Sequence, residues 1–141
     1  EAISVDLPGS VDARSIALTG NQLYVGRANN PSGPELFVFD VRSLLGGNTT
    51  PLATSEVGTD VTSLRVSGGI LFVGTTKTGE EVQVWRTDTS TWNSSTANSG
   101  RVSFFSFPRL APLGIDIGGN FLFAVSQSSS QTEYIKILRT L

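Results

Sequence analysis

Three segments of the chain resemble one another, and this internal repeat constrains the fold more strongly than any other feature of the sequence. Each segment joins two apolar or alternating stretches through a short turn, which reads Gly-Asn, Gly-Gly and Gly-Asn in order. The matched leucines Leu23, Leu71 and Leu122 lie 48 and 51 positions apart. Because Gly and Asn tolerate the positive φ of tight turns, each segment is predicted to form a β-hairpin.

Further strands extend each hairpin into a larger unit. Third strands, rich in β-branched and aromatic residues, are predicted at residues 36–39, 82–85 and 135–138. Fourth strands are predicted at residues 51–56 and 102–107, with a counterpart before the first unit at residues 3–7. With the strands lettered a to d, the chain is predicted to run d-abcd-abcd-abc as one domain. Its units are residues 8–56, 57–107 and 108–141, plus the strand at residues 3–7.

The second strands of the units are apolar at consecutive positions, as in Ile70-Leu71-Phe72-Val73. An antiparallel strand with one wet face alternates between apolar and polar residues, so consecutive apolar residues indicate that both faces are covered. Units of four antiparallel strands at a spacing of roughly 40–50 residues are typical of β-propellers. The sequence therefore predicts an all-β fold, a β-propeller-type array of about three four-stranded antiparallel blades.

Residues 13–41 resemble the YVTN and LVIVD repeats of bacterial and archaeal β-propellers. Those repeats carry an L-Y-V strand, a polar loop and an apolar strand that ends in V-x-D, and here Leu23-Tyr24-Val25 and Val38-Phe39-Asp40 match. The second and third units have Arg86 and Arg139 where the Asp falls. The resemblance implies a propeller fold and a bacterial or archaeal cell surface, and it supports a fold rather than an activity.

Three blades are fewer than the roughly 4–8 that known propellers use. Three blades alone leave two apolar sheet faces uncovered, and such faces mark interfaces. We therefore expect the array to be completed by other copies, a dimer giving six blades, or by a longer parent chain. The strand at residues 3–7 is expected to pair beside residues 135–138 of the same chain or of a neighbour. Self-association is the predicted partner interaction.

The residue content argues against several kinds of chemistry. The chain has no Cys and no His, which removes thiolate sites, the commonest general base and the commonest metal ligand. We therefore expect no catalytic residues, metal or cofactor, and a protein that is not an enzyme. A net charge of −2 without a Lys/Arg cluster argues against nucleic acid as a partner. No apolar run approaches the roughly 20 residues of a membrane span.

Only 16% of the residues are charged, against the ~25% usual in globular domains, which favours an extracellular or cell-surface location. Two Asn-x-Ser/Thr motifs begin at Asn48 and Asn93, and they accept glycans only in a glycosylating secretory route.

The acidic residues offer few candidates for chemistry. Glu80 and Glu81 are adjacent, so on a strand they point to opposite faces, and they are expected in a solvated loop. Asp12 and Asp60 occupy equivalent repeat positions, where they cap the turn into strand a or form a ring of carboxylates at a channel mouth. Asp116 is expected either to face Arg65 of the preceding unit, as an ion pair, or to face bound solvent.

The aromatic residues supply the candidate interaction sites. Trp92 stands in a long polar loop, where it either presents its ring to a sugar or a partner or folds back over a blade edge. Phe104, Phe105 and Phe107 make the fourth strand of the second unit unusually apolar, so this strand is expected to be covered by a neighbouring subunit or by the long loop.

These observations predict a non-catalytic extracellular structural or interaction subunit that self-associates through propeller blades. The alternative is a fragment of a larger ligand-binding or carbohydrate-binding propeller whose site lies partly outside this chain. A glycan is the possible small partner in that alternative, and the identity of any ligand stays open.

Overall fold

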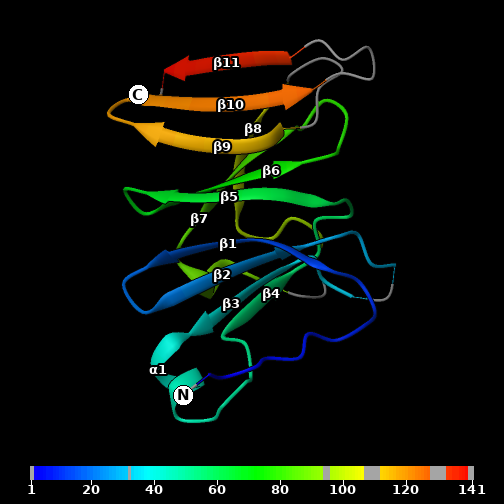
Figure 1. Cartoon of the computed structure of the whole chain (residues 1–141), viewed down its shortest axis with the longest axis vertical. Helices are drawn as coiled ribbons and strands as arrows, with labels where there is room; N and C mark the ends of the chain where they lie inside the picture. The colour runs from blue at the N-terminus through cyan, green and yellow to red at the C-terminus, as the bar shows by residue number, and fades with distance from the viewer. Residues whose placement is uncertain (1, 32, 94–95, 107–111, 128–132, 140–141) are drawn as a thin grey trace.

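The computed structural model describes residues 2–31, 33–93, 96–106, 112–127 and 133–139. In these ranges the chain forms three antiparallel sheets, which Figure 1 shows in series along the long axis. Sheet I contains β1 (Ala13–Thr19), β2 (Gln22–Arg27), β3 (Leu36–Asp40) and β4 (Ala53–Ser55). Sheet II contains β5 (Val61–Ser67), β6 (Ile70–Thr75), β7 (Val82–Arg86) and β8 (Arg101–Phe105). Sheet III contains β9 (Pro112–Gly118), β10 (Phe121–Gln127) and β11 (Glu133–Arg139). The predicted all-β class is confirmed.

Two short helical turns interrupt the strands. The helix α1 (Val41–Leu45) follows β3, and the side chain of Asp40 accepts a hydrogen bond from Ser43 N at 2.8 Å as its N-cap. The 3₁₀ turn η1 (Thr89–Thr91) lies in the loop between β7 and β8. Among the described residues, no helix has the length and apolar character that crossing a membrane requires.

The three hairpins share one register, as the repeat predicts. In each hairpin one extra residue bulges out of the first strand at the same repeat position. The bulged residues are Arg14, Thr62 and Leu113. A glycine with positive φ stands in each tight turn, at Gly20, Gly68 and Gly119, which is the conformation that the turn signal predicts.

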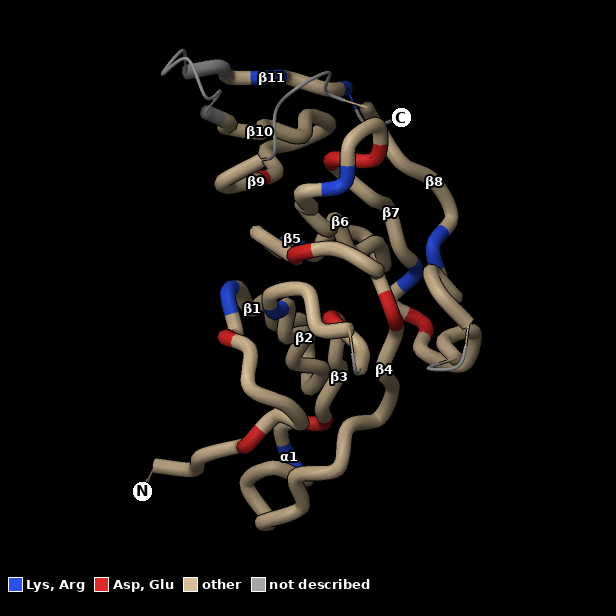
Figure 2. The backbone as a smooth tube through the Cα atoms, turned by 90° about the vertical axis from the view of Figure 1, so that its right-hand side faces the viewer, with Lys and Arg blue, Asp and Glu red and all other residues tan. Residues whose placement is uncertain are grey.

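The sheets pack face to face through two hydrophobic layers. We call the face of a sheet that points toward the next sheet in the chain its forward face, and the opposite one its rear face. The first layer joins the forward face of sheet I (Tyr24, Val38) to the rear face of sheet II (Leu71, Trp85). The second joins sheets II and III through Phe72 and other apolar residues. The inner strands β1, β5 and β9 lie side by side, and the sheets extend away from them (Figures 1 and 2).

The expected strand at residues 3–7 is absent, which corrects the prediction. The described N-terminal segment has no strand, and its residues Val5 and Leu7 pack on the rear face of sheet I. This segment lies at one end of the molecule and β11 at the other, so it cannot pair with β11 of its own chain (Figure 1). The apolar side chains of this segment pack on the nearby rear face of sheet I, because the edge of β11 is too distant for the segment to pair with it. The other predicted strands correspond to β1–β11.

Candidate functional site

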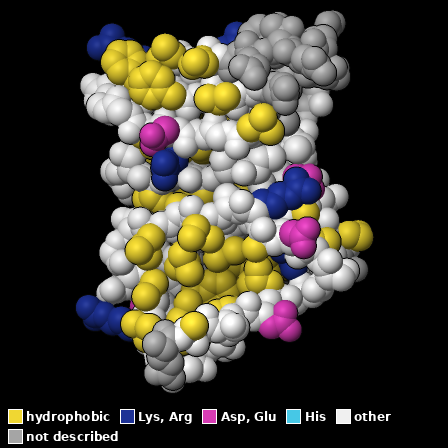
Figure 3. Space-filling view, in the orientation of Figure 1, with side chains coloured by type: hydrophobic (Ala, Val, Ile, Leu, Met, Phe, Trp, Pro, Cys, Tyr) yellow, Lys and Arg dark blue, Asp and Glu magenta, His cyan; other side chains and the backbone are white. Residues whose placement is uncertain are grey.

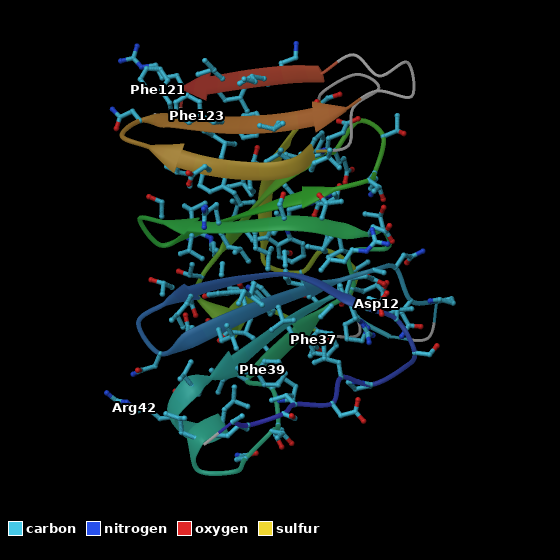
Figure 4. All side chains as sticks on the ribbon, in the orientation of Figure 1. Asp12, Phe37, Phe39, Arg42, Phe121 and Phe123 are labelled. Carbon is cyan, nitrogen blue, oxygen red and sulfur yellow. The ribbon has the colours of Figure 1, made fainter. Side chains whose placement is uncertain are left out.

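The forward face of sheet III is apolar and open to solvent. Phe123 lies opposite Ile137, and Val125 lies opposite Ile135, so each pair shares a face of the sheet. Ile135 is 69% exposed and Ile137 is 60% exposed, and Val125 is also exposed. Figures 3 and 4 show hydrophobic side chains at this end of the molecule, with Phe121 and Phe123 among them.

The same repeat positions are buried in the other two sheets. Leu36 and Val38 of β3, which correspond to Ile135 and Ile137, are completely buried between sheets I and II. Val82 and Val84 occupy these positions in β7 and are buried between sheets II and III. The exposure of the sheet III residues therefore reflects the lack of a further sheet in this chain's described fold.

The rear face of sheet I is only partly covered. The N-terminal segment and α1 pack over its outer half, where Val25, Phe37 and Phe39 are buried. Ile16 and Leu18 on β1 stay exposed, although their counterparts on β5 and β9 are buried or half-buried. Figure 4 shows Phe37 and Phe39 at this end, opposite to the end that carries Phe121 and Phe123. Two apolar faces thus terminate the described fold.

The predicted aromatic candidates on β8 are found at different depths. Phe104 is 48% exposed, and the guanidinium of Arg101 lies over its ring at 5.4 Å. Phe105 is half-buried and packs on the layer between sheets II and III. Phe107 lies outside the described residues. Phe104 is therefore the member of this set that is available to a partner.

Trp92 does not present its ring to solvent. It is 8% exposed, and its ring lies 5.3 Å from that of Trp85 and 6.2 Å from that of Tyr24. Its Nε1 donates a hydrogen bond to the carbonyl of Arg86 at 3.1 Å. The long loop folds back so that Trp92 closes the layer between sheets I and II. The prediction that Trp92 presents its ring to a sugar or a partner is therefore corrected, because little of the ring surface is exposed.

The predicted acidic positions are dispersed over the structure. Asp60 reaches from sheet II to the first unit, where its carboxylate accepts from Arg14 Nη1 and from Asn29 N, both at 2.7 Å. Arg65 Nε donates to Asp116 Oδ1 at 2.9 Å in an exposed pair between β5 and β9. Asp12 is exposed at the start of β1 (Figure 4). Among the described residues, no group of three acidic side chains is arranged to hold a metal ion.

The expectation for Glu81 is wrong, because its side chain is 2% exposed rather than solvated. Its Oε1 accepts a hydrogen bond from Gly79 N at 2.8 Å. Glu80, its neighbour, forms ion pairs with Lys77 at 2.9 Å and with Arg101. A carboxylate can be buried stably when a backbone N–H of its own loop replaces the water that would otherwise donate a hydrogen bond to it.

A second buried carboxylate, Glu35, was missed by the sequence reasoning. It precedes β3 as Glu81 precedes β7, so the repeat itself contains the signal. Its Oε2 accepts hydrogen bonds from Val57 N at 2.8 Å and from Gly58 N at 2.9 Å. Burial and the hydrogen bond and charge of Glu35 raise the pKa of the nearby Glu56 to about 7. Arg27 is buried beside this pair and donates to the carbonyls of Pro34, at 2.7 Å, and Pro8.

Comparisons with known proteins support the fold. No protein-family model matches the chain, and no curated protein matches it, so the resemblance to YVTN and LVIVD repeats stays a prediction. The computationally designed Ika4 protein is similar in structure, with a TM-score of 0.52 at 17% identity over 97% of each chain. Glutaminyl cyclase from Myxococcus xanthus is similar with a TM-score of 0.50 at 13% identity. That match covers 88% of this chain and about half, 51%, of the cyclase chain.

Proposed function

We propose that this chain is a non-catalytic structural subunit that associates with other copies through its uncovered sheet faces. In this proposal the three sheets are blades of a propeller-type array that neighbouring copies complete, and the protein works at the cell surface or outside the cell. The N-terminal segment, residues 3–7, pairs with the open edge of β11 of a neighbouring copy and supplies the fourth strand that sheet III lacks.

One observation carries the proposal. Ile135 and Ile137 are 69% and 60% exposed, whereas the equivalent Leu36 and Val38 are 0% exposed at a junction within the chain. This difference supports the proposal that a further sheet packs on this face. Each Å² of apolar surface removed from water contributes on the order of 25 cal/mol, so covering this face favours association.

The non-catalytic part of the proposal rests on the side chains that are present. General acid–base or nucleophilic catalysis needs a positioned base, and the chain has no His and no Cys. The buried carboxylates of Glu35 and Glu81 accept hydrogen bonds from backbone N–H groups, which supports a structural role for these two side chains. The low charged fraction supports the extracellular or cell-surface location.

The experiment is sedimentation equilibrium of the purified chain over a wide range of concentration. We expect dimers or larger species, and we expect Ile137→Glu to weaken association at least tenfold, because an ionised carboxylate in an apolar contact is strongly unfavourable. Leu52→Glu, at an exposed leucine that lines a cleft beside Thr91 and Trp92, is the matched control. A wild-type chain that stays monomeric at all concentrations would refute the proposal.

A second candidate function, ligand binding, is favoured by one cleft. A space of about 540 Å³ between sheets II and III is walled by apolar residues that include Phe72 and Phe105, with Arg139 among its lining. Apolar walls beside one guanidinium suit an amphipathic carboxylate. Calorimetric titration with decanoate tests this candidate, and binding that is lost in Arg139→Gln would support it over a purely structural role.

A further inference from the structure

We infer that the forward face of sheet III binds the rear face of sheet I of a second copy, head to tail, and that Val125 and Ala13 are the residues that select this partner. The inference rests on the proposed self-association and specifies which faces meet. It derives from a pattern of large and small residues that the two junctions inside the chain reveal.

At the first internal junction, sheet II approaches sheet I so closely that only glycine fits. A Cβ on Gly26 would overlap with Val61 Cγ1 and lie 3.0 Å from Val61 Cβ, and it would also lie 2.9 Å from Ser15 Oγ of its own sheet. Val61 is completely buried on the inner strand of sheet II. At this repeat position, therefore, a glycine on the forward face receives a larger residue from the rear face of the next sheet.

The second internal junction repeats this arrangement. Gly74 occupies the position of Gly26, and Pro112 occupies that of Val61. A Cβ on Gly74 would lie 3.2 Å from Pro112 Cγ, as well as overlapping Ser63 Oγ of its own sheet. Glycine thus again lies opposite a larger residue of the following inner strand.

The two ends of the chain carry the reverse combination. Val125 stands on the forward face of sheet III where the other sheets have glycine, and Ala13 stands on β1 where the others have Val61 and Pro112. Within sheet III, Gly114 lies opposite Val125 at the position of Ser15 and Ser63, so its own sheet also leaves room for the valine. Both side chains are exposed. Ala13 has no Cγ, so the side-chain atom that a forward-face Cβ would overlap at the first internal junction is absent from this contact. The larger Val125 on the forward face of one copy therefore complements the smaller Ala13 on the rear face of a second copy.

The bulged residues support the same pairing of faces. Arg14 on sheet I donates to Asp60 of the following unit, and Thr62 on sheet II donates to the carbonyl of Pro112. Leu113 is the equivalent on sheet III, and it is exposed. By the same repeat, Leu113 would lie next to Asp12 and Ala13 of a second copy, which are the equivalents of Asp60 and Pro112.

The N-terminal segment is compatible with this contact because it is held only loosely. Among the described residues, no backbone hydrogen bond joins residues 2–7 to a strand, and Val5 and Leu7 provide the packing on sheet I. Residues 5–7 are the repeat equivalents of residues 53–55, which form β4, and they precede them by 48 positions. In this arrangement the segment of the second copy leaves its own rear face and joins the edge of β11 in the first copy, as β4 joins β3.

The test exchanges the selecting residues. In sedimentation equilibrium, Ala13→Val is expected to weaken association at least tenfold, and Ala13→Val/Val125→Gly is expected to restore it to within about threefold, because the pair becomes the Gly–Val pair of the first junction. Ala13→Val/Val125→Ala keeps the Cβ and is not expected to restore it. Ala97→Val, at an exposed loop position, is the matched control. Thermal unfolding shows that each variant is folded.

A mixing experiment distinguishes this arrangement from a symmetric contact between two sheet III faces. Ile137→Glu and Leu18→Glu each block one face, so each alone is expected to stay monomeric while a mixture forms a one-to-one pair. A symmetric contact instead leaves Leu18→Glu unaffected, which would overturn the inference. An Ala13→Val variant that associates as the wild type does would also overturn it, and in both results the proposed self-association stands. A monomeric wild-type chain refutes both.

Discussion

Glu35 connects three parts of the first unit through a single buried side chain. Its Oε1 accepts from Asn30 N at 3.0 Å in the loop before β3, and its Oε2 accepts from the backbone that leads to β5. The carboxylate therefore fixes both the loop and the connection between sheets I and II. Three charge-assisted hydrogen bonds compensate for the cost of its burial.

The raised pKa of Glu56 predicts a pH dependence of stability. Burial, and after it the contact with Glu35, raises the pKa to about 7 from an ordinary value of 4.5. Between these two values the folded state binds a proton that the unfolded state has lost, so stability falls as the pH rises from about 4.5 to about 7 and then levels off. Glu56→Gln removes this proton equilibrium, and we expect it to raise the melting temperature at pH 8 and to change it little at pH 5.

The measurement is thermal unfolding by circular dichroism from pH 5 to pH 8. Glu80→Gln is the matched control, because ion pairs with Lys77 and Arg101 outweigh the effect of burial and lower the pKa of Glu80. That substitution removes a favoured negative charge, so it is expected to lower the melting temperature at pH 8. Parallel profiles for the wild type and Glu56→Gln would contradict the assignment.

The sequence indicated these residues less well than it indicated the strands. The sequence predicts Glu81 in solvent because adjacent charged residues usually are, yet its carboxylate is buried and accepts a hydrogen bond from the backbone N–H of Gly79. This contact depends on loop geometry that no periodicity encodes. The repeat offered one signal, since Glu35 and Glu81 occupy the same position before the third strand of their units.

The loop between β7 and β8 covers one side of the hydrophobic layer between sheets I and II. It begins with the turn η1, which Asp88 caps by accepting from Ser90 N at 3.0 Å. Its backbone returns to the first unit through a hydrogen bond from Asn98 N to the carbonyl of Glu56 at 2.8 Å. The loop thereby places Trp92 between Tyr24 of sheet I and Trp85 of sheet II.

Replacement of Trp92 is predicted to destabilise the whole molecule. Trp92→Ala removes a large buried ring from the layer between two sheets and is expected to cost about 3–5 kcal/mol in the free energy of unfolding. Urea titration measures this value. Phe104→Ala, on the exposed side of β8, is the control and is expected to cost less than about 1 kcal/mol. A loss below 1 kcal/mol for Trp92→Ala would mean that the loop contributes little to the packing of the sheets.

At the level of elements, patterning predicted the hairpins and failed at the N-terminus. Alternation and Gly-containing turns are local signals, and β1–β11 follow them closely. The N-terminal segment has a strand-like pattern at residues 3–7, but a strand also needs an edge to pair with. The edge of β11 lies at the other end of the chain, so local sequence cannot decide the outcome.

Few charges accompany the apolar faces at the two ends of the molecule. The chain has ten basic and twelve acidic residues, which Figure 2 shows dispersed along the backbone. The forward face of sheet III carries Phe121, Phe123, Val125, Ile135 and Ile137, and its charged residues by register are Asp116 opposite Phe123 and Arg139 opposite Phe121. In the proposed self-association, we expect the burial of apolar surface on this face to contribute more than electrostatics.

This balance predicts a self-association that depends little on salt. Between 0.05 and 0.5 M NaCl the dissociation constant is expected to change by less than about threefold, because screening acts on charges and few charges lie at the contact. Light scattering or sedimentation over this range measures it. A weakening of tenfold or more at high salt would show that ion pairs, rather than the apolar face, hold the copies together.

The difference between the two end faces has a consequence for growth. A contact between unlike faces leaves one unused face at each end of every assembly, so addition continues until the geometry closes a ring or monomer runs out. Polymers built in this way have two different ends. Their growth is stopped by trace amounts of a subunit in which one of the two contact faces is blocked. Leu18→Glu, blocked at its rear face, would act as such a chain terminator, and its potency would report whether the wild-type protein forms closed rings or open fibres.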